Sequence, residues 1–244
     1  MRKKIGRPDH MQTKDHLALG LGLLAGTQDE GLEKHKRAFL FGCVEPDFNP
    51  LTYLRGYMHE KRFRGHNAEN SRTHIHACME RLCLHGLCSA YSYFTLGAML
   101  HYVADSFTFP HNAFFQGTIH EHREYESRLH QVFSGKNHMF GIVGAEYCQD
   151  PWNFLLFEHR RYGEASPSLG TDYQYIVRVC ACLLSRFLQP VRAKNALGGP
   201  VQQACLNRLP VEWCFPDHLA YGLDAPYGLL SNRNPVRTYP GPCP

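Results

Sequence analysis

Segments with the apolar spacing of α-helices follow one another through the first 190 residues, and few stretches show the two-residue alternation of a half-buried strand. A helix with one apolar face must bury that face against another element, and here only other helices are available. The sequence therefore predicts an all-α fold, a multi-helix bundle. Its expected helices lie at 17–26, 30–44, 66–84, 89–107, 119–133 and 172–188, with the second ending before Pro46.

The composition changes after residue 190. Residues 191–244 hold 8 of the 15 prolines and no periodic stretch longer than a turn or two. Proline removes a backbone donor and interrupts regular structure, so this part is expected to be irregular. The predicted organisation is a helical domain at 1–190 and a Pro/Gly-rich tail at 191–244.

The N-terminal region has basic residues followed by an apolar run at 17–26, which loosely matches a signal peptide. Charged residues and histidines precede the run and no A-x-A cleavage motif follows it, so a core helix beginning near Thr13 or Asp15 is favoured over secretion. The ten cysteines include no CxxC pair, and several lie in apolar, helix-like stretches. Buried free thiols of this kind indicate a cytoplasmic protein.

Histidine is unusually frequent, with 16 residues against 22 Asp and Glu together. Histidine is the commonest metal ligand, so this excess suggests a metal site. The formal net charge of +4 is too small to demand a nucleic-acid partner, but it is compatible with phosphates or an anionic membrane surface. We therefore expect no stable nucleic-acid partner.

The strongest candidate site segment is His101-Tyr-Val-Ala-Asp105, followed by Pro110-His111. His101 and Asp105 are four residues apart, so they share one face of a helix whose other residues are apolar. A charged Asp in such a helix is costly unless it is paired or binds a metal. Pro110 would end the helix and let His111 turn back toward the same point. The alternative is a buried His–Asp pair that stabilises the core.

A second segment, at 120–126, contains two His/carboxylate pairs with the same spacing: His120 with Glu124, and His122 with Glu126. Either pair could bind a metal, or the segment could be a solvated charged face. At 100° per residue the two pairs occupy nearly opposite sides of the helix. The second pair shares its side with apolar residues, which favours His122 and Glu126 as the inward pair: Ile119, Tyr125, Leu129 and Phe133.

Three upstream residues complete the candidate set. His16 opens the first helix, Asp47 lies in an expected loop after Pro46, and His66 opens the helix at 66–84. Each alone is more typical of a helix cap than of a ligand. They support a metal site only through their order in the chain relative to the two downstream segments.

In that order, these residues resemble the zinc-dependent phospholipase C family, which shares its all-helical fold with nucleases of the P1 nuclease type. HYVAD…PH resembles the family's H-Y-x-x-D…P…H signature, and HREYE is similar to H-x-x-[FY]-E. The elements GCVEPD and GHN resemble the family's loop Asp and its following His. The resemblance covers about residues 10–190.

The resemblance implies a cluster of two or three zinc ions that hydrolyses a phosphodiester of a phospholipid. Zinc would polarise the phosphoryl oxygens and lower the pKa of a bound water, which then attacks as hydroxide. In this hypothesis Asp105 bridges two ions, and Asp47 is both a ligand and the base that orients the water. The implied ligands are His16, Asp47, His66, His101, Asp105, His111, His122 and Glu126.

The chain departs from the family at its N-terminus. Secreted members use a processed N-terminal tryptophan as a ligand, whereas the tryptophans here are Trp152 and Trp213. The corresponding ion is then missing, or is held by His10 or water. Two alternatives stay open: a single-strand nuclease, with Tyr53, Tyr57 and nearby basic residues as a stacking groove, and a non-catalytic metal-binding module that kept the fold.

Overall fold

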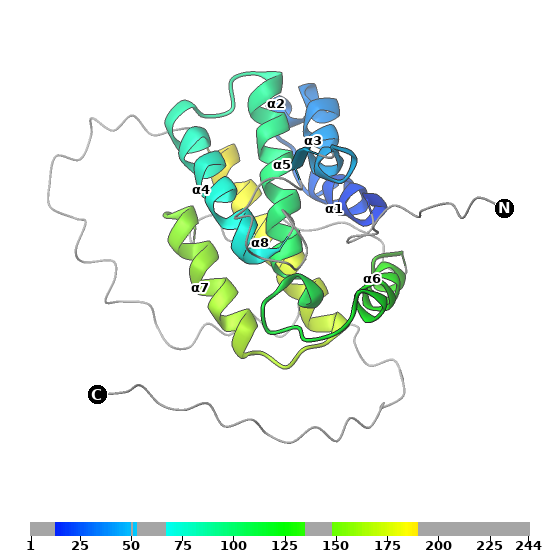
Figure 1. The fold of residues 1–244 in the computed structure, drawn as a ribbon. Helices are drawn as coiled ribbons and strands as arrows, with labels where there is room; N and C mark the ends of the chain where they lie inside the picture. The colour runs from blue at the N-terminus through cyan, green and yellow to red at the C-terminus, as the bar shows by residue number, and fades with distance from the viewer. Residues whose placement is uncertain (1–12, 50, 53–66, 135–147, 190–244) are drawn as a thin grey trace, which may run out of the picture. The chain divides into compact units, whose positions relative to one another are not determined.

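The computed structural model describes residues 13–49, 51–52, 67–134 and 148–189. Within these ranges the chain forms eight α-helices and no strand, which confirms the all-α prediction. The tail predicted at 191–244 lies outside the described residues. The helices (Figure 1) are α1 (Thr13–Ala25), α2 (Glu30–Lys34), α3 (Lys36–Phe48), α4 (Ala68–His85), α5 (Ala90–Ser106), α6 (Ile119–Ser134), α7 (Pro151–Glu164) and α8 (Leu169–Leu188), with a short 3-10 helix, η2 (Phe109–His111).

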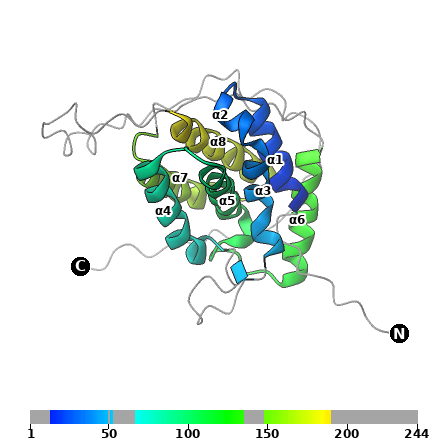
Figure 2. The same cartoon turned by 90° about the horizontal axis from the view of Figure 1, so that it is seen from above.

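Helix α5 lies at the centre of the helical unit. Every residue from Thr95 to Ser106 is buried, so no face of this part of the helix is left for solvent. Figure 2 shows α5 nearly end-on, with α3, α4, α7 and α8 around it. His101 and Asp105 are therefore placed in the interior by the helix that carries them.

Side-chain caps define where several helices begin. Asn67 accepts a hydrogen bond from the amide of Asn70 at the start of α4, and Ser168 accepts one from Thr171 at the start of α8. Ser89 and Ser92 form a reciprocal capping box at the start of α5. Each cap satisfies amides that have no partner within the helix.

Two glycines allow α3 and α5 to cross at very close range. A Cβ atom on Gly42 of α3 would lie 2.2 Å from the carbonyl oxygen of Phe94, and one on Gly97 of α5 would lie 2.1 Å from the carbonyl oxygen of Phe39. Both clashes are with backbone atoms, which cannot swing away as a side chain can. The crossing brings the end of α3, which carries Asp47, next to His101.

We expect Gly97→Ala to destabilise the protein by about 3 kcal/mol or more, because the added methyl group forces two helix backbones apart. Gly163→Ala is the matched control, since its new Cβ would meet nothing closer than 3.8 Å. Because alanine is the better helix former, that control should be neutral or raise stability by up to about 1 kcal/mol. Thermal and urea unfolding measure both. Equal stability of the two variants would contradict the close crossing.

The prediction that a helix ends before Pro46 is wrong. Helix α3 continues through Pro46 to Phe48. Pro46 sits in the last turn, where its missing amide costs one backbone hydrogen bond, and the turn is closed by other donors. The amide of Asn49 bonds to the carbonyl oxygen of Glu45 at 3.0 Å, and the hydroxyl of Thr52 bonds to that of Pro46 at 2.7 Å. Asp47 consequently lies on a helix and not in a loop.

Two further differences from the sequence prediction concern whole helices. The expected helix at 30–44 is divided at His35 into α2 and α3. Helix α7 was missed, although it has a recognisable start: Asp150 accepts hydrogen bonds from the amides of Trp152 and Asn153, and Pro151 follows the cap. Its buried residues are spaced by four, three and four positions, which is also helical: Pro151, Leu155, Glu158 and Tyr162.

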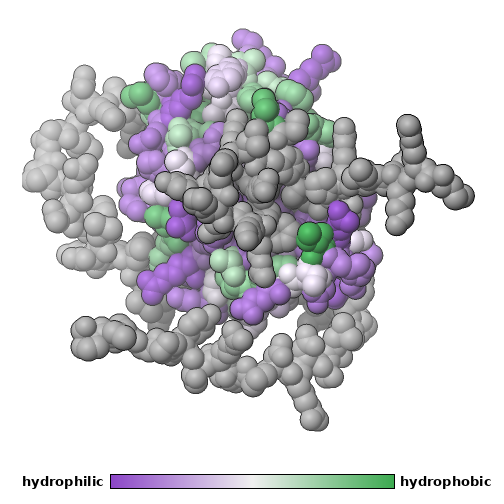
Figure 3. Space-filling model, in the orientation of Figure 1, coloured by the Kyte–Doolittle hydropathy of each residue, from purple (hydrophilic) through white to green (hydrophobic). Residues whose placement is uncertain are grey.

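The surface view in Figure 3 mixes hydrophilic and hydrophobic residues among those that are coloured, with the hydrophobic ones in scattered patches. None of the helices in the described ranges combines the length and the apolar character needed to cross a membrane.

Candidate metal centre

His101 and Asp105 project from one face of α5 and are almost completely buried, at 1% and 0% exposure. His101 Nε2 lies 3.4 Å from Asp105 Oδ2 and 3.6 Å from Asp47 Oδ1. The other ring nitrogen, Nδ1, lies 2.9 Å from the carbonyl oxygen of Cys43 on α3. A backbone acceptor at Nδ1 holds the imidazole with Nε2 directed at the carboxylates, which is the usual arrangement of a histidine metal ligand.

His16 approaches the same point from α1. Its Nε2 is 3.3 Å from Asp105 Oδ1, and its ring stacks on that of His101 with centroids 3.7 Å apart. The ligand atoms of His16, His101 and Asp105 all lie within 4.8 Å of one another, so one ion could contact all three. We call these three residues the first group.

His111, His122 and Glu126 form a second buried group whose ligand atoms also lie within 4.8 Å of one another. Glu126 Oε1 is 2.7 Å from His122 Nε2 and 3.0 Å from His111 Nε2. Helix α5 ends at Ser106 and η2 follows directly, so the chain turns back as the sequence predicted and brings His111 toward α6. The other two members, His122 and Glu126, are four residues apart on α6 and therefore share one face of that helix.

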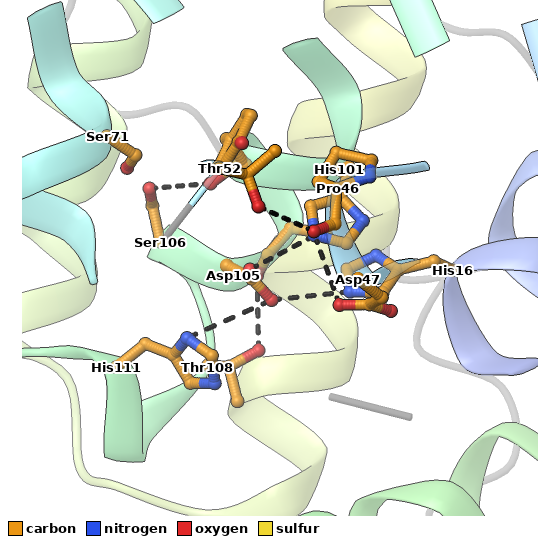
Figure 4. A network of polar contacts seen from close by, with 12 residues as sticks. His16, Pro46, Asp47, Thr52, Ser71, His101, Asp105, Ser106, Thr108 and His111 are labelled. Carbon is orange, nitrogen blue, oxygen red and sulfur yellow. Dashed lines mark hydrogen bonds and ion pairs between the residues drawn. The ribbon is translucent and has the colours of Figure 1, made fainter. Parts of the chain in front are cut away.

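Asp105 belongs to the first group and also faces His111 of the second group (Figure 4). Its Oδ1 is 3.3 Å from His16 Nε2 and 3.9 Å from His111 Nδ1, while its Oδ2 faces His101. A carboxylate in this position can serve two cations at once and reduce their mutual repulsion. The geometry is therefore compatible with a carboxylate that two ions share.

The pKa shifts of Asp105 and His122 favour cation binding, whereas that of His101 favours a bound proton. Burial would raise the pKa of Asp105, but the charges of His111 and His101 outweigh it and hold that pKa well below its usual range. Burial lowers the pKa of His122, against the opposing effect of its bond to Glu126. For His101, burial would lower the pKa, but the charges of Asp47 and Asp105 raise it, so the field at this ring is negative. Ionised carboxylates and neutral imidazoles are the states that bind metals.

Several buried polar atoms of the cluster have no hydrogen-bond partner among the residues that the structure describes. They include both ring nitrogens of His16, both carboxylate oxygens of Asp47 and Oε2 of Glu126. Buried polar groups are nearly always satisfied, so a concentration of unsatisfied donors and acceptors is expected only where a ligand completes them. The donor set of imidazoles and carboxylates suits zinc. The residues present thus fit a zinc cluster.

The seven candidate ligands that lie within the described ranges all meet at this cluster, and the eighth, His66, lies outside them. The choice between the two pairs of α6 also agrees with the observed burial. His122 and Glu126 are each 1% exposed, whereas His120 and Glu124 are exposed. Ile119 differs from the prediction: although it was placed on the inward side, it is 63% exposed, because it is the first residue of the helix.

One set of contacts to the segments that carry the ligands was not predicted from the sequence. Asp172 of α8 bonds to the amide of Phe109 in η2 and to the hydroxyl of Tyr125 in α6. The sequence signal is weak, because an acidic residue in the first turn of a helix usually complements the helix dipole on the surface. Only its position in a strongly apolar helix hinted at burial.

A central helix with a buried histidine and a buried carboxylate, joined by candidate ligands from α1, α3, η2 and α6, defines an all-helical metalloprotein. More specifically, the chain belongs to the zinc-dependent phospholipase C family, whose model matches residues 9–165. The matched region contains all eight candidate ligands and ends before α8. No curated protein and no solved structure matches the chain.

Proposed function

We propose that the protein is a zinc-dependent phosphodiesterase that hydrolyses a phospholipid or a related phosphoester. The observation that carries this proposal is the buried cluster itself: two groups of candidate ligands linked by Asp105, with several buried polar atoms that have no hydrogen-bond partner among the described residues. Membership of the zinc-dependent phospholipase C family supports both the metal and the reaction class.

His16, His101 and Asp105 would hold one ion, with Asp47 and His66 as further ligands, and His111, His122 and Glu126 would hold another. Zinc bound there would act as a Lewis acid on the phosphoryl oxygens and would make an adjacent water more acidic near neutral pH. The proposed total is two or three ions per chain.

Asp47 is the residue we assign as the base. Its side chain is 7% exposed, against 0–2% for its partners in the cluster, so it is the most exposed of the described candidate ligands although its two oxygens are buried. Neither of its oxygens has a hydrogen bond from another described residue, so one could accept a proton from an attacking water while the other could hold an ion. The other ligands are shielded from solvent, which strengthens their electrostatic effect on a bound phosphate.

The reaction needs no protein nucleophile. Cys43 is the described thiol whose backbone touches the cluster, and burial raises its pKa to about 12. The thiol therefore stays protonated at neutral pH and is a poor nucleophile. This supports attack by water oriented by Asp47.

The substrate we favour is a phospholipid, with peripheral contact to an anionic membrane surface that the net charge of +4 permits. The nuclease alternative depended on Tyr53, Tyr57 and neighbouring basic residues, which lie outside the described residues. A cytoplasmic location remains our proposal and agrees with the seven described cysteines, all of which are free thiols.

The test measures the zinc content of the protein and then its turnover of two substrates, a chromogenic phosphocholine ester and single-stranded DNA. Protein purified without chelator should contain two or three zinc ions per chain and hydrolyse a chromogenic phosphocholine ester. A chelator should abolish turnover and added zinc should restore it. Asp47→Asn should retain most of the metal but lose turnover. Less than one metal per chain rejects the proposal, turnover of single-stranded DNA alone selects the nuclease, and metal without turnover of either substrate selects the non-catalytic module.

A further inference from the structure

Asp172 is a fully buried carboxylate, at 0% exposure, in the first turn of α8. It accepts three hydrogen bonds from three other elements. The amide of Phe109 in η2 and the hydroxyl of Tyr125 in α6 bond to Oδ2, at 2.8 and 2.9 Å, and the hydroxyl of Tyr162 in α7 bonds to Oδ1 at 2.7 Å. One side chain therefore joins four elements at a single point.

All three donors to Asp172 are neutral, and no ion pair to it is found among the described residues. Burying a carboxylate without an ion pair is costly, and burial raises the pKa of Asp172 to about 6 against the opposing effects of these donors and of the charge of His111. An apolar side chain of similar size would avoid this cost. Stability alone therefore gives little reason for an ionisable residue at this position.

The two donors to Oδ2 belong to the segments that carry the second group of ligands. Phe109 is in the same short turn as His111, and Tyr125 directly precedes Glu126 on the helix that also carries His122. Both segments meet at one oxygen atom, so the position of that atom sets the separation of η2 and α6. The contact between His111 and Glu126, at 3.0 Å, depends on this separation.

We infer that Asp172 is a positioning residue for the second metal: from α8 it holds η2 and α6 at the distance at which His111, His122 and Glu126 can share one ion. It touches neither an ion nor the substrate, and it acts through Phe109 and Tyr125. The inference rests on the proposed function only in requiring that the second group binds a metal. Outer partners of this kind typically change metal affinity by about 10- to 100-fold.

The test measures the zinc affinity of each site by titrating metal-free protein against a competing chelator dye. Asp172→Leu should weaken one site by about 10- to 100-fold and leave the other within about threefold. Asp172→Asn should restore most of the affinity, because its amide oxygen can still accept the bonds at Oδ2. In a Glu126→Ala background, Asp172→Leu should have no further effect, since the site on which it acts is already lost.

Glu158→Leu is the matched control. Glu158 is also a buried carboxylate, 4% exposed, and its ion pairs are with Arg161 and Arg178, on α7 and α8, which carry none of the candidate ligands. It should lower the melting temperature and leave both zinc affinities unchanged. Equal losses of affinity in Glu158→Leu and Asp172→Leu would overturn the inference, because they would indicate a general effect of lost stability.

A second variant serves if Asp172→Leu does not fold. Tyr125→Phe removes one bond to Asp172 without exposing the core, and should weaken the same site several-fold. Unchanged affinities at both sites in Tyr125→Phe or in folded Asp172→Leu would overturn the inference. Wild-type protein that binds no zinc would instead reject the proposed function. Wild-type protein that binds two ions without hydrolysing the ester would leave the inference standing.

Discussion

Replacing Asp105 with asparagine should remove at least one zinc ion per chain and reduce hydrolysis by about 1,000-fold or more. Asn keeps the shape of the side chain but not its charge, and the charge is what a shared carboxylate contributes between two cations. Asp105 is the residue that faces both groups, with His16 and His101 on one side and His111 on the other. Losing several kcal/mol of charge stabilisation corresponds to three or more factors of ten in rate.

Metal content by elemental analysis and turnover of the phosphocholine ester measure this effect. Asp150→Asn makes the same chemical change at the exposed cap of α7 and should alter neither, because asparagine caps a helix as well as aspartate does. A change of a single histidine ligand, such as His16→Ala, should reduce metal content and activity less than Asp105→Asn does. If Asp105→Asn retains both metal content and activity, Asp105 is not the shared ligand.

Changes at the two pairs on α6 should have opposite outcomes. His122→Ala or Glu126→Ala should remove one zinc ion and most of the activity, because Glu126 Oε1 is the atom on which His111 and His122 converge. His120→Ala and Glu124→Ala should leave metal content unchanged and alter stability by no more than about 0.5 kcal/mol, since both residues are exposed.

These four variants control one another. Each His or Glu of the buried pair is compared with the same residue type two positions away on the same helix. Elemental analysis after gel filtration and thermal unfolding provide the comparison. Equal losses of metal from both pairs would mean that α6 contributes no specific ligand pair. Loss from His120→Ala and Glu124→Ala alone would assign the site to the opposite face.

Features that depend on neighbours in the chain were predictable from the sequence. The helix period of the apolar residues predicted an all-α fold, and spacing by four residues predicted that His101 with Asp105, and His122 with Glu126, share a helix face. The apolar company of His122 also predicted the inward side of α6. Each of these inferences needs only the geometry of one helix, which local sequence specifies. Helix α7 carried comparable local signals at Asp150 and Pro151, so its omission was avoidable.

Only the tertiary structure decided which of these faces meet. His16 reaches Asp105 because α1 packs beside α3 and α5, and His101 is oriented by the carbonyl oxygen of Cys43 on a different helix. Asp47 is brought to the cluster by a crossing so close that it requires Gly42 and Gly97, and by a helix that continues past Pro46.

Asp172 shows the same division most clearly. In the sequence it is an acidic residue near the start of a helix, a position that normally faces solvent. In the folded chain it is buried and receives donors from η2, α6 and α7. Contacts between residues far apart in sequence depend on how all the helices pack together, and no local pattern encodes that packing. The sequence determined the candidate ligands and most of the elements that carry them, Asp47 being the exception, whereas packing determined the cluster that they form.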